Sequence, residues 1–489
     1  MDHFQLYIAG EFTGGADGTT MQTINPATGQ PWASFDCAAP ADVNRAVAAA
    51  KAALDDPAWR DITQTERGKM IHRLADLIAE NADHLGAIET TDSGKLAVET
   101  KAQTGYVADY YRYYAGLADK IEGAVLPIDK PNMHVFTKPM PIGVVAAIVP
   151  WNAQMFLSAT KLGPALAAGC TMVLKASEIA PAPMLEFARL IHEAGFPPGV
   201  VSVITGDAAS CAIPLTQHPD IDRIAFTGGP ETARHVVRNS AENFAVTTLE
   251  LGGKSPILVF EDADIDAAAN GLIAGNFGAS GQSCVAGSRG LVQRSIYDAV
   301  VEKVTEKASG LVVGDPHDPK THLGPLCTLA QVEKIEATLK TAQDQGAKIA
   351  FGGQRAVPDG NYMQPTLVLA DKPETETLKV EMFGPIMTLI PFDTEEDAIN
   401  MANDSDFGLG SGVFTQNLAR AHRVSQRIRS GITWVNTYRA ISPIAPFGGF
   451  NQSGYGREAG KEAILDYMRT KTTWIDTSEG PMANPFVMR

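Results

Sequence analysis

One of the five cysteines lies in a segment made almost entirely of small residues. Cys284 is within residues 278–288, which read GASGQSCVAGS. Small neighbours leave room for a substrate, and the backbone N–H groups of such a loop stabilise a thiolate or an oxyanion. Most cysteines are buried structural residues, and that interpretation holds for the other four, Cys37, Cys170, Cys211 and Cys327. The setting of Cys284 predicts a nucleophile.

Two polar residues at the ends of apolar runs have chemistry that would complement a thiol. Glu250 lies between two leucines in residues 248–253, TLELGG, so burial should raise its pKa towards the range of a general base. The alternative is a carboxylate that caps the next helix. Asn152 follows Trp151 after another apolar run. Its amide could donate a hydrogen bond to a developing oxyanion, and the alternative is that Asn152 is simply a turn residue.

Phosphate-binding signals are weaker. No G-x-G-x-x-G follows any expected strand, but residues 226–229, FTGG, lead into a helix that starts near Pro230. Glycines before a helix N-terminus are compatible with a pyrophosphate. Lys175 and Glu178 follow another strand and are suited to ribose hydroxyls, where the glutamate would disfavour the extra phosphate of NADP.

Composition excludes several classes of protein. The chain has 489 residues, a net charge of −16, 45% apolar residues and 20% charged residues, which predicts two or three globular domains. The acidic balance argues against nucleic acid as a partner. The sequence shows neither a membrane span nor a signal peptide. An odd number of spaced cysteines and no H-E-x-x-H argue against a disulfide framework or a metal site, and fit a cytoplasmic protein.

The pattern of apolar residues predicts which elements position these groups. Helices are expected over 41–54, 66–85 and 94–118, where most of the tyrosines should pack between helices. From residue 142 short apolar runs alternate with helical stretches, which predicts an α/β fold with a parallel sheet covered on both faces. Ligands bind at the carboxyl ends of such strands. The expected strands span 143–149, 171–175, 200–205, 223–227, 246–251 and 255–260.

A second alternating region runs from about 255 to 450, with helices expected near 295–310, 329–346 and 394–403. Residues 471–478, KTTWIDTS, form a β-like segment with no obvious partner nearby in the sequence. A terminal strand of this kind often pairs with another chain.

Taken together and in this order, the motifs closely resemble the aldehyde dehydrogenase superfamily. Residues 249–254 (LELGGK) are followed by 281–284 (GQSC), so that Cys284 lies 34 positions after Glu250. The other matching segments are 150–152 (PWN), 161–166 (KLGPAL), 175–178 (KASE), 381–385 (EMFGP) and 446–454 (PFGGFNQSG).

The resemblance implies a fold and an assembly. A Rossmann-like NAD domain would comprise residues 1–121 and 141–252, and a catalytic α/β domain carrying the thiol would comprise 253–452. A small β element for oligomerisation would combine 122–140 with 469–489. Relatives of this kind are homodimers or homotetramers.

The resemblance also implies roles for residues of this chain. Cys284 would attack an aldehyde, the Asn152 amide and the Cys284 N–H would hold the oxyanion, and Glu250 would activate the water that hydrolyses the thioester. The resemblance also places Lys161 among the catalytic residues. NAD, in preference to NADP, would contact Ile148, Trp151, Lys175, Ser177, Glu178, Gly228, Gly229, Leu251, Glu381 and Phe383. The aldehyde would contact Phe156, Thr160, Ser283, Val285, Arg439 and Ile441.

Some residues depart from the family pattern. Gly229 replaces a common serine, Ala176 replaces a proline, and Ala208 and Ala212 replace glycines. A Cβ crowds an approaching backbone, so the last two changes bear on the position of the cofactor.

Two other functions stay open on the sequence. A relative that passes the acyl group to coenzyme A generally lacks the glutamate found here at position 250. A non-catalytic member of the fold would lose the thiol or the base. For the substrate, one hypothesis is that Arg439 binds the carboxylate of a semialdehyde, and the alternative is a surface arginine paired with a nearby acid.

Overall fold

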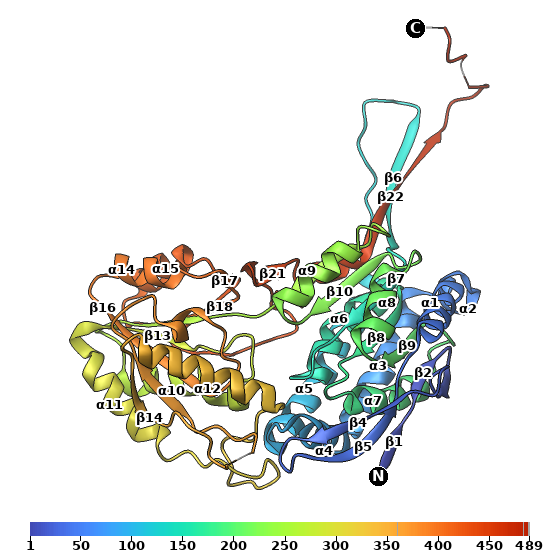
Figure 1. The fold of residues 1–489 in the computed structure, drawn as a ribbon. Coiled ribbons are helices and arrows are strands. Elements are labelled where there is room, and N and C mark those ends of the chain that lie inside the picture. The colour runs from blue at the N-terminus through green and yellow to red at the C-terminus, as the bar shows by residue number, and fades with distance from the viewer. Residues whose placement is uncertain (359, 483, 488–489) are drawn as a thin grey trace.

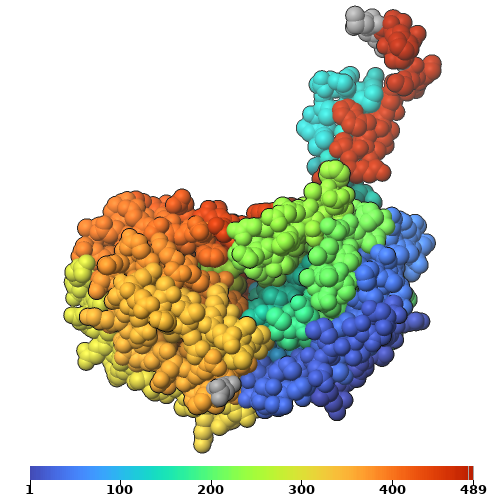
Figure 2. Space-filling model, viewed as in Figure 1, coloured from blue at the N-terminus to red at the C-terminus, as the bar shows by residue number. Residues whose placement is uncertain are grey.

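A computed structural model describes residues 1–358, 360–482 and 484–487. Two lobes, each built around one sheet, lie side by side, and a two-stranded arm projects from one of them (Figure 1). In the space-filling view a hollow separates the two lobes, and residues near 160 are visible at its floor (Figure 2). The predicted α/β class is therefore confirmed. Among the described helices, none is long and apolar enough to cross a membrane.

The first lobe contains an eight-stranded sheet in the order β21-β11-β10-β7-β8-β9-β2-β3. Its five central strands are parallel and almost wholly buried, because helices cover both faces. The central strands are β7 (Val144–Ile148), β8 (Thr171–Ala176), β9 (Val201–Thr205), β10 (Arg223–Thr227) and β11 (Val246–Glu250), and the edge strands are β2 (Leu6–Ile8), β3 (Glu11–Thr13) and β21 (Gly454–Tyr455). The strands expected in this region are confirmed.

Helices of the first lobe pack on both faces of this sheet. They are α1 (Pro40–Asp55), α2 (Pro57–Arg60), α3 (Gln64–Glu80), α4 (Ala82–Ser93), α5 (Ala97–Leu117), α6 (Gln154–Ala168), α7 (Ala182–Glu193), α8 (Ile213–Gln217) and α9 (Pro230–Asn239). The single helix expected over 66–85 is wrong. Asn81 leaves helical geometry with φ −108° and ψ 13°, and its side chain donates to the carbonyl of Leu77 at 2.8 Å, which ends α3 and starts α4.

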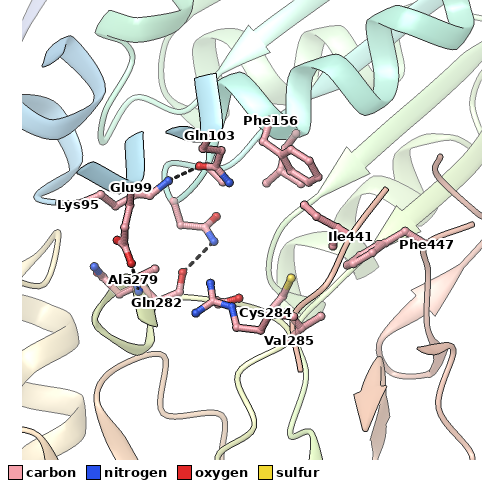
Figure 3. Close-up of a pocket in the computed structure, with 15 residues that line it drawn as sticks. Lys95, Glu99, Gln103, Phe156, Ala279, Gln282, Cys284, Val285, Ile441 and Phe447 are labelled. Atoms are coloured by element: carbon pink, nitrogen blue, oxygen red, sulfur yellow. Dashed lines mark hydrogen bonds between the residues drawn. The ribbon is translucent and has the colours of Figure 1, made fainter. Parts of the chain in front are cut away.

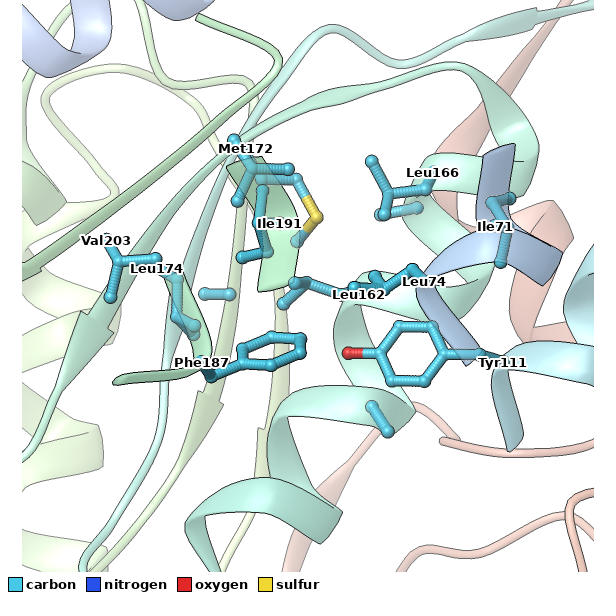
Figure 4. Close-up of a cluster of buried hydrophobic side chains, with 14 of the residues drawn as sticks. Ile71, Leu74, Tyr111, Leu162, Leu166, Met172, Leu174, Phe187, Ile191 and Val203 are labelled. Carbon is cyan, nitrogen blue, oxygen red and sulfur yellow. The ribbon is translucent and has the colours of Figure 1, made fainter. Parts of the chain in front are cut away.

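The larger core of this lobe lies between the sheet and α3, α5, α6 and α7. Figure 4 shows Leu74, Leu162 and Phe187 converging on it, together with the Tyr111 ring. Tyr110, Tyr111 and Tyr114 are all buried, which confirms that these tyrosines of α5 are packing residues. The core holds α6 firmly against β7 and β8, and the loop between β7 and α6 carries Asn152.

The second lobe contains a seven-stranded sheet in the order β14-β15-β16-β13-β12-β18-β19, parallel except for β14. The expected helices near 295–310, 329–346 and 394–403 are confirmed. The strands are β12 (Pro256–Val259), β13 (Arg289–Gln293), β14 (Lys348–Phe351), β15 (Thr366–Leu369), β16 (Ile386–Phe392), β18 (Gly410–Phe414) and β19 (Ile432–Val435). The helices are α10 (Ile265–Phe277), α11 (Tyr297–Ala308), α12 (Leu329–Asp344), α13 (Glu376–Lys379), α14 (Glu395–Asn403) and α15 (Leu418–Arg427).

Small sheets complete the fold. A three-stranded sheet at the N-terminus joins β1 (Asp2–Phe4), β5 (Gln30–Asp36) and β4 (Thr20–Asn25), and a short ladder joins β17 (Phe407–Gly408) to β20 (Phe450–Asn451). The arm pairs β6 (Met133–Pro141) with β22 (Met468–Asp476), antiparallel and in continuous register (Figure 1). The C-terminal strand thus has a partner in its own chain, which the sequence around it does not reveal because more than 300 residues intervene.

Candidate active site

Cys284 lies where two cavities meet. The first has a volume of about 300 Å³ and the second about 200 Å³, and Asn152, Leu157 and Cys284 line both. In Figure 3 the sulfur of Cys284 points into the first cavity. Cys284 is partly exposed, whereas the other four cysteines are buried, so Cys284 is the cysteine that a ligand in these cavities can reach.

The loop that carries Cys284 follows α10 and is fixed at several points. Ala279 and Ser280 both adopt left-handed backbone, with φ near +50°, a conformation that non-glycine residues adopt rarely and mostly where the surroundings enforce it. The Ala279 N–H donates to Glu99, the Ser280 hydroxyl to the carbonyl of Gly324, and the Cys327 N–H to the side chain of Gln282. These contacts hold Cys284 in one place relative to both cavities.

Asn152 lies immediately after β7, beside the thiol. The strand order reverses between β7 and β10, and this is where α/β sheets bind ligands. The Asn152 amide donates to the carbonyl of Gln282 at 3.0 Å, two residues before Cys284. A neutral N–H donor in this place suits an oxyanion that forms on a carbon attached to Cys284.

Glu250 ends β11 and faces the second cavity together with Cys284. Its side chain is 3% exposed, and neither carboxylate oxygen has a hydrogen-bond partner in the described protein. Burial, and then the negative charge of Glu458, raise the pKa of Glu250 well above that of an exposed glutamate, while Lys161 and Arg457 oppose the shift. A buried, unpaired carboxylate with a raised pKa beside a nucleophile is suited to take a proton from water.

Lys161 belongs to a buried network behind Glu250 and does not line either cavity. Its Nζ donates to Thr227 Oγ1 at 2.6 Å and to Glu458 Oε1 at 2.5 Å. Thr160 Oγ1 donates to the other Glu458 oxygen at 2.7 Å, so this predicted substrate residue faces Glu458 and a smaller neighbouring cavity. Glu458 had no signal in the sequence, because it belongs to none of the motifs and lies near the end of the chain.

The second cavity brings together most of the residues predicted to bind a cofactor. Gly229 is the N-cap of α9 and makes no side-chain cap, so the N–H groups that follow Pro230 in the first turn of this ten-residue helix are available to an anion. The rings of Trp151 and Phe383 meet edge to face at 5.4 Å. The predicted residues that line this cavity are Trp151, Gly228, Gly229, Leu251, Glu381 and Phe383.

The remaining predicted cofactor residues lie at the same edge of the sheet, outside this cavity. Ile148 and Lys175 are adjacent in the register of β7 and β8. Lys175 Nζ pairs with Glu178 Oε2 at 2.5 Å, and Ser177 lies between them in the chain. Two cavity residues that the sequence did not indicate are Gln331 and Lys334 of α12, which donate to the carbonyls of Met382 and Glu381.

The two glycines of LELGGK each accommodate a functional residue. A Cβ on Gly252 would lie 2.2 Å from the carboxylate of Glu381, and a Cβ on Gly253 would lie 2.4 Å from the carbonyl oxygen of Cys284. The Gly253 N–H donates to Glu381 Oε1 at 2.9 Å, which orients this carboxylate in the cavity. Burial raises the pKa of Glu381.

The first cavity has one apolar wall and one polar wall. Of the predicted substrate residues, Phe156, Ser283, Val285, Arg439 and Ile441 line it. The polar wall was not predicted. It consists of Lys95, just before α5, and of Glu99 and Gln103 within the first two turns of that helix. Figure 3 shows the Lys95 amine directed to Gln103, with an Nζ to Oε1 distance of 2.5 Å. Charged residues on a helix look like a solvated face in the sequence, so nothing marked them.

Comparisons with known proteins agree with this geometry. The family model described as "Aldehyde dehydrogenase family" matches residues 12–473. The (Z)-2-((N-methylformamido)methylene)-5-hydroxybutyrolactone dehydrogenase of Acinetobacter baylyi is 54% identical over 490 residues and covers 100% of both chains.

Solved structures are similar along the whole chain. Betaine aldehyde dehydrogenase from Staphylococcus aureus in complex with NAD⁺ has a TM-score of 0.96 at 35% identity, with 99% of this chain and 96% of that chain covered. The NAD⁺ complex of an aldehyde dehydrogenase from Bacillus cereus has a TM-score of 0.95 at 38% identity, with 98% and 97% covered. The expected fold is confirmed, and this chain belongs to the aldehyde dehydrogenase family.

Proposed function

We propose that this protein oxidises an aldehyde to a carboxylic acid with NAD, through a thioester on Cys284 that is hydrolysed by water. The observation that carries the proposal is the meeting of two cavities at one thiol, with the buried carboxylate of Glu250 beside it. Family membership and the NAD⁺ complexes of two similar enzymes support the choice of reaction and cofactor.

The residues of the second cavity fit a dinucleotide. The uncapped N-terminus of α9 suits the pyrophosphate, and the buried Glu381 carboxylate suits a ribose hydroxyl. We infer that Lys175 and Glu178 hold the other ribose, where the Glu178 carboxylate disfavours the extra phosphate of NADP. When bound, NAD supplies a hydride acceptor.

The protein residues act in a fixed order. The Cys284 thiolate adds to the aldehyde carbon, and the Asn152 amide and the Cys284 N–H stabilise the resulting oxyanion. When the oxyanion collapses, the carbon loses a hydride and becomes a thioester. Glu250 then takes a proton from water, the hydroxide adds to the thioester carbon, and the carboxylic acid leaves as the Cys284 thiolate is regenerated.

Lys161 is inferred to be a positioning residue for this step. It holds Glu458 by a 2.5 Å contact, and the charges of both residues act on the pKa of Glu250 in opposite directions. Lys161 and Glu458 therefore set the pKa of Glu250 through their charges, and neither residue lines the first cavity.

The similarity to the Acinetobacter enzyme supports a substrate of the same chemical type. A 5-hydroxybutyrolactone is the ring-closed form of a 4-oxo acid, and ring opening releases one aldehyde and one carboxylate. Only the open form presents an aldehyde carbon to the thiolate, because ring closure converts that carbon to a hydroxylated sp³ centre. We therefore propose that a 4-oxo acid, in equilibrium with its hydroxylactone, is the class of substrate oxidised here.

We also propose the domain division, assembly and location that the resemblance implied. Residues 1–121 with 141–252 would form the NAD domain, 253–452 the catalytic domain, and 122–140 with 469–489 the oligomerisation element. The projecting arm supports a homodimer or homotetramer, because among the described strands β6 and β22 pair only with each other and extend away from the lobes (Figure 1). Five free thiols support a cytoplasmic location.

The test of the function is NADH absorbance after mixing the protein with NAD and 4-oxobutanoate, butanal or benzaldehyde. We expect NADH without coenzyme A, and the matching acid by chromatography. NADH only in the presence of coenzyme A would establish acyl transfer instead. Silence in both conditions, across the panel, would favour a non-catalytic member of the family.

Gly252→Ala should weaken cofactor binding. The added Cβ forces the Glu381 carboxylate away from its position beside the Gly253 N–H. Loss of one hydrogen bond to a charged group corresponds to an increase in the KM for NAD of roughly tenfold to a hundredfold. Steady-state titration with NAD measures it. The matched control is Gly116→Ala on α5, where a Cβ meets nothing within 4 Å, and an unchanged KM in Gly252→Ala would contradict the role of Glu381.

A further inference from the structure

We propose that Arg439 binds the carboxylate of the substrate, so that the enzyme selects aldehydes that carry an acid group close to the carbonyl. The inference rests on the proposed function, because it assigns the substrate class of the same cavity. It also decides how a 4-oxo acid enters: as the open, anionic form and not as the neutral lactone.

Arg439 is the cation of the first cavity that forms no ion pair among the described residues, and the carboxylate of Glu99 in the opposite wall accepts instead from the Ala279 N–H. Arg439 is partly buried, and no carboxylate of the described residues forms an ion pair with it. Among the described residues, its side chain donates from Nη1 to the carbonyl of Ala274, at 3.3 Å. Lys95, the other cation of the cavity, is paired with Glu89 at 3.0 Å. A partly desolvated guanidinium without a partner favours an anionic ligand.

The surrounding backbone holds Arg439 in place before any ligand arrives. The residue adopts left-handed backbone with φ 65°. Its neighbours fix both sides: the Tyr438 hydroxyl donates to the carbonyl of Val285 at 2.9 Å, and the Trp434 ring donates to the carbonyl of Ala440 at 2.8 Å. Tyr106 donates to the carbonyl of Ile441. These contacts fix the backbone from which the guanidinium extends, so little backbone freedom is lost when a ligand binds.

Arg439 is also close enough to the nucleophile to affect it. Its charge acts to lower the pKa of the Cys284 thiol, against the larger effect of burial. The rest of that wall is apolar, with Phe156, Val285 and Phe447. A short carbon chain between an aldehyde at Cys284 and a carboxylate at Arg439 therefore matches the distribution of charge in the cavity, and a neutral chain leaves the guanidinium unpaired.

The test compares two aldehydes with four carbons, 4-oxobutanoate and butanal. The wild-type protein should prefer 4-oxobutanoate. Arg439→Gln should lower kcat/KM for 4-oxobutanoate by about 30-fold or more beyond any decrease for butanal, mainly through KM, because loss of the charge near Cys284 affects both aldehydes equally. Arg439→Lys should retain part of the preference, because it keeps the charge but loses the bidentate geometry. Arg294→Gln removes an exposed arginine far from the cavity and is the matched control.

A binding measurement separates this inference from the proposed reaction. Butanedioate, the product expected from 4-oxobutanoate, should slow the alkylation of Cys284 by iodoacetamide in the wild-type protein and not in Arg439→Gln. Equal protection in both proteins, or a parallel loss of activity with both aldehydes in the variant, would overturn the role of Arg439. Turnover of butanal with no preference for the acid would overturn the inference alone, whereas no NADH from any aldehyde would overturn the proposed function.

Discussion

We expect Cys284→Ser to lower kcat for every aldehyde by at least about 10⁴-fold. A serine hydroxyl is nearly the same size as a thiol, so the loop should keep its hydrogen bonds to Glu99, Gly324 and Cys327. The hydroxyl is, however, a far weaker nucleophile and a poorer leaving group than the thiol. NADH absorbance measures the loss. Residual activity above about 1% of wild type would show that another group attacks the aldehyde.

The matched control for the nucleophile is a buried cysteine outside the site. Cys170 is the residue immediately before β8, and its thiol donates to the carbonyl of Tyr467 at 3.2 Å. Cys170→Ala should therefore affect stability and leave kcat within about twofold. The two variants distinguish loss of the nucleophile from a general effect of removing a thiol.

The titration of Cys284 provides a second readout of the same residue. Burial, with the negative charges of Glu381 and Glu250, raises the pKa of this thiol to about 12 in the free protein. Because the thiolate is the reactive form, alkylation by iodoacetamide should be slow at pH 7 and rise about tenfold for each pH unit up to at least pH 9. In Cys284→Ser this pH-dependent alkylation should be absent.

Glu250→Gln should separate the two halves of the reaction. Hydride leaves before water enters, so one NADH should still form rapidly for each Cys284. Steady-state turnover should then fall by about 10² to 10⁴-fold, because glutamine cannot take a proton from water and the thioester persists. Stopped-flow absorbance measures the burst, and mass spectrometry of the quenched protein should find the acyl group on Cys284.

The pH profile gives the control for this variant. A general base acts only when deprotonated, so kcat of the wild type should decrease as the pH falls through the pKa of Glu250. Since burial raises that pKa, the acid limb should lie at higher pH than for an exposed glutamate. Glu250→Gln should lack the limb, and Glu242→Gln, on the exposed surface, should keep it. Loss of the burst along with turnover would place Glu250 before hydride transfer and contradict its role.

The sequence predicted the site best where a functional residue follows directly from a strand. Asn152 follows β7 and Glu250 ends β11, two parallel strands with β10 between them, and the carboxyl ends of such strands lie at one edge of the sheet. Cys284 was marked by the small residues of its own loop. In each case the evidence is contained in a few consecutive residues, so one short motif is enough to place the side chain.

Residues that reach the site through tertiary contacts could not be found in this way. Glu458 meets Lys161 across 297 residues of sequence, and a glutamate outside any motif has no distinguishing pattern. In the sequence, Lys95 and Gln103 have the pattern of a solvent-exposed helix face. Only the packing of α5 against the Cys284 loop brings them into the cavity. For the same reason the partner of β22 was missed, and the break at Asn81 depended on a local hydrogen bond that helical periodicity does not register.

The short strand β21 fixes the order in which the molecule can be assembled. It follows the whole second lobe in the chain, yet it pairs with β11, where Gly454 lies opposite Glu250. The carboxylate partner of the buried Lys161 arrives on the same segment, as Glu458. By contrast, the sheet of the second lobe makes all its strand pairs within residues 256–435.

During synthesis, the sheet of the first lobe therefore cannot be completed until the second lobe has been made. Until residue 458 has left the ribosome, β11 lacks its edge partner and Lys161 is a charge without a counter-ion in an apolar core, which is strongly unfavourable. The second lobe has no such requirement and can complete its sheet first. Glu250, the proposed base, thus gains its strand partner from the last part of the chain to be made, so this edge of the candidate site forms only when the polypeptide is almost finished.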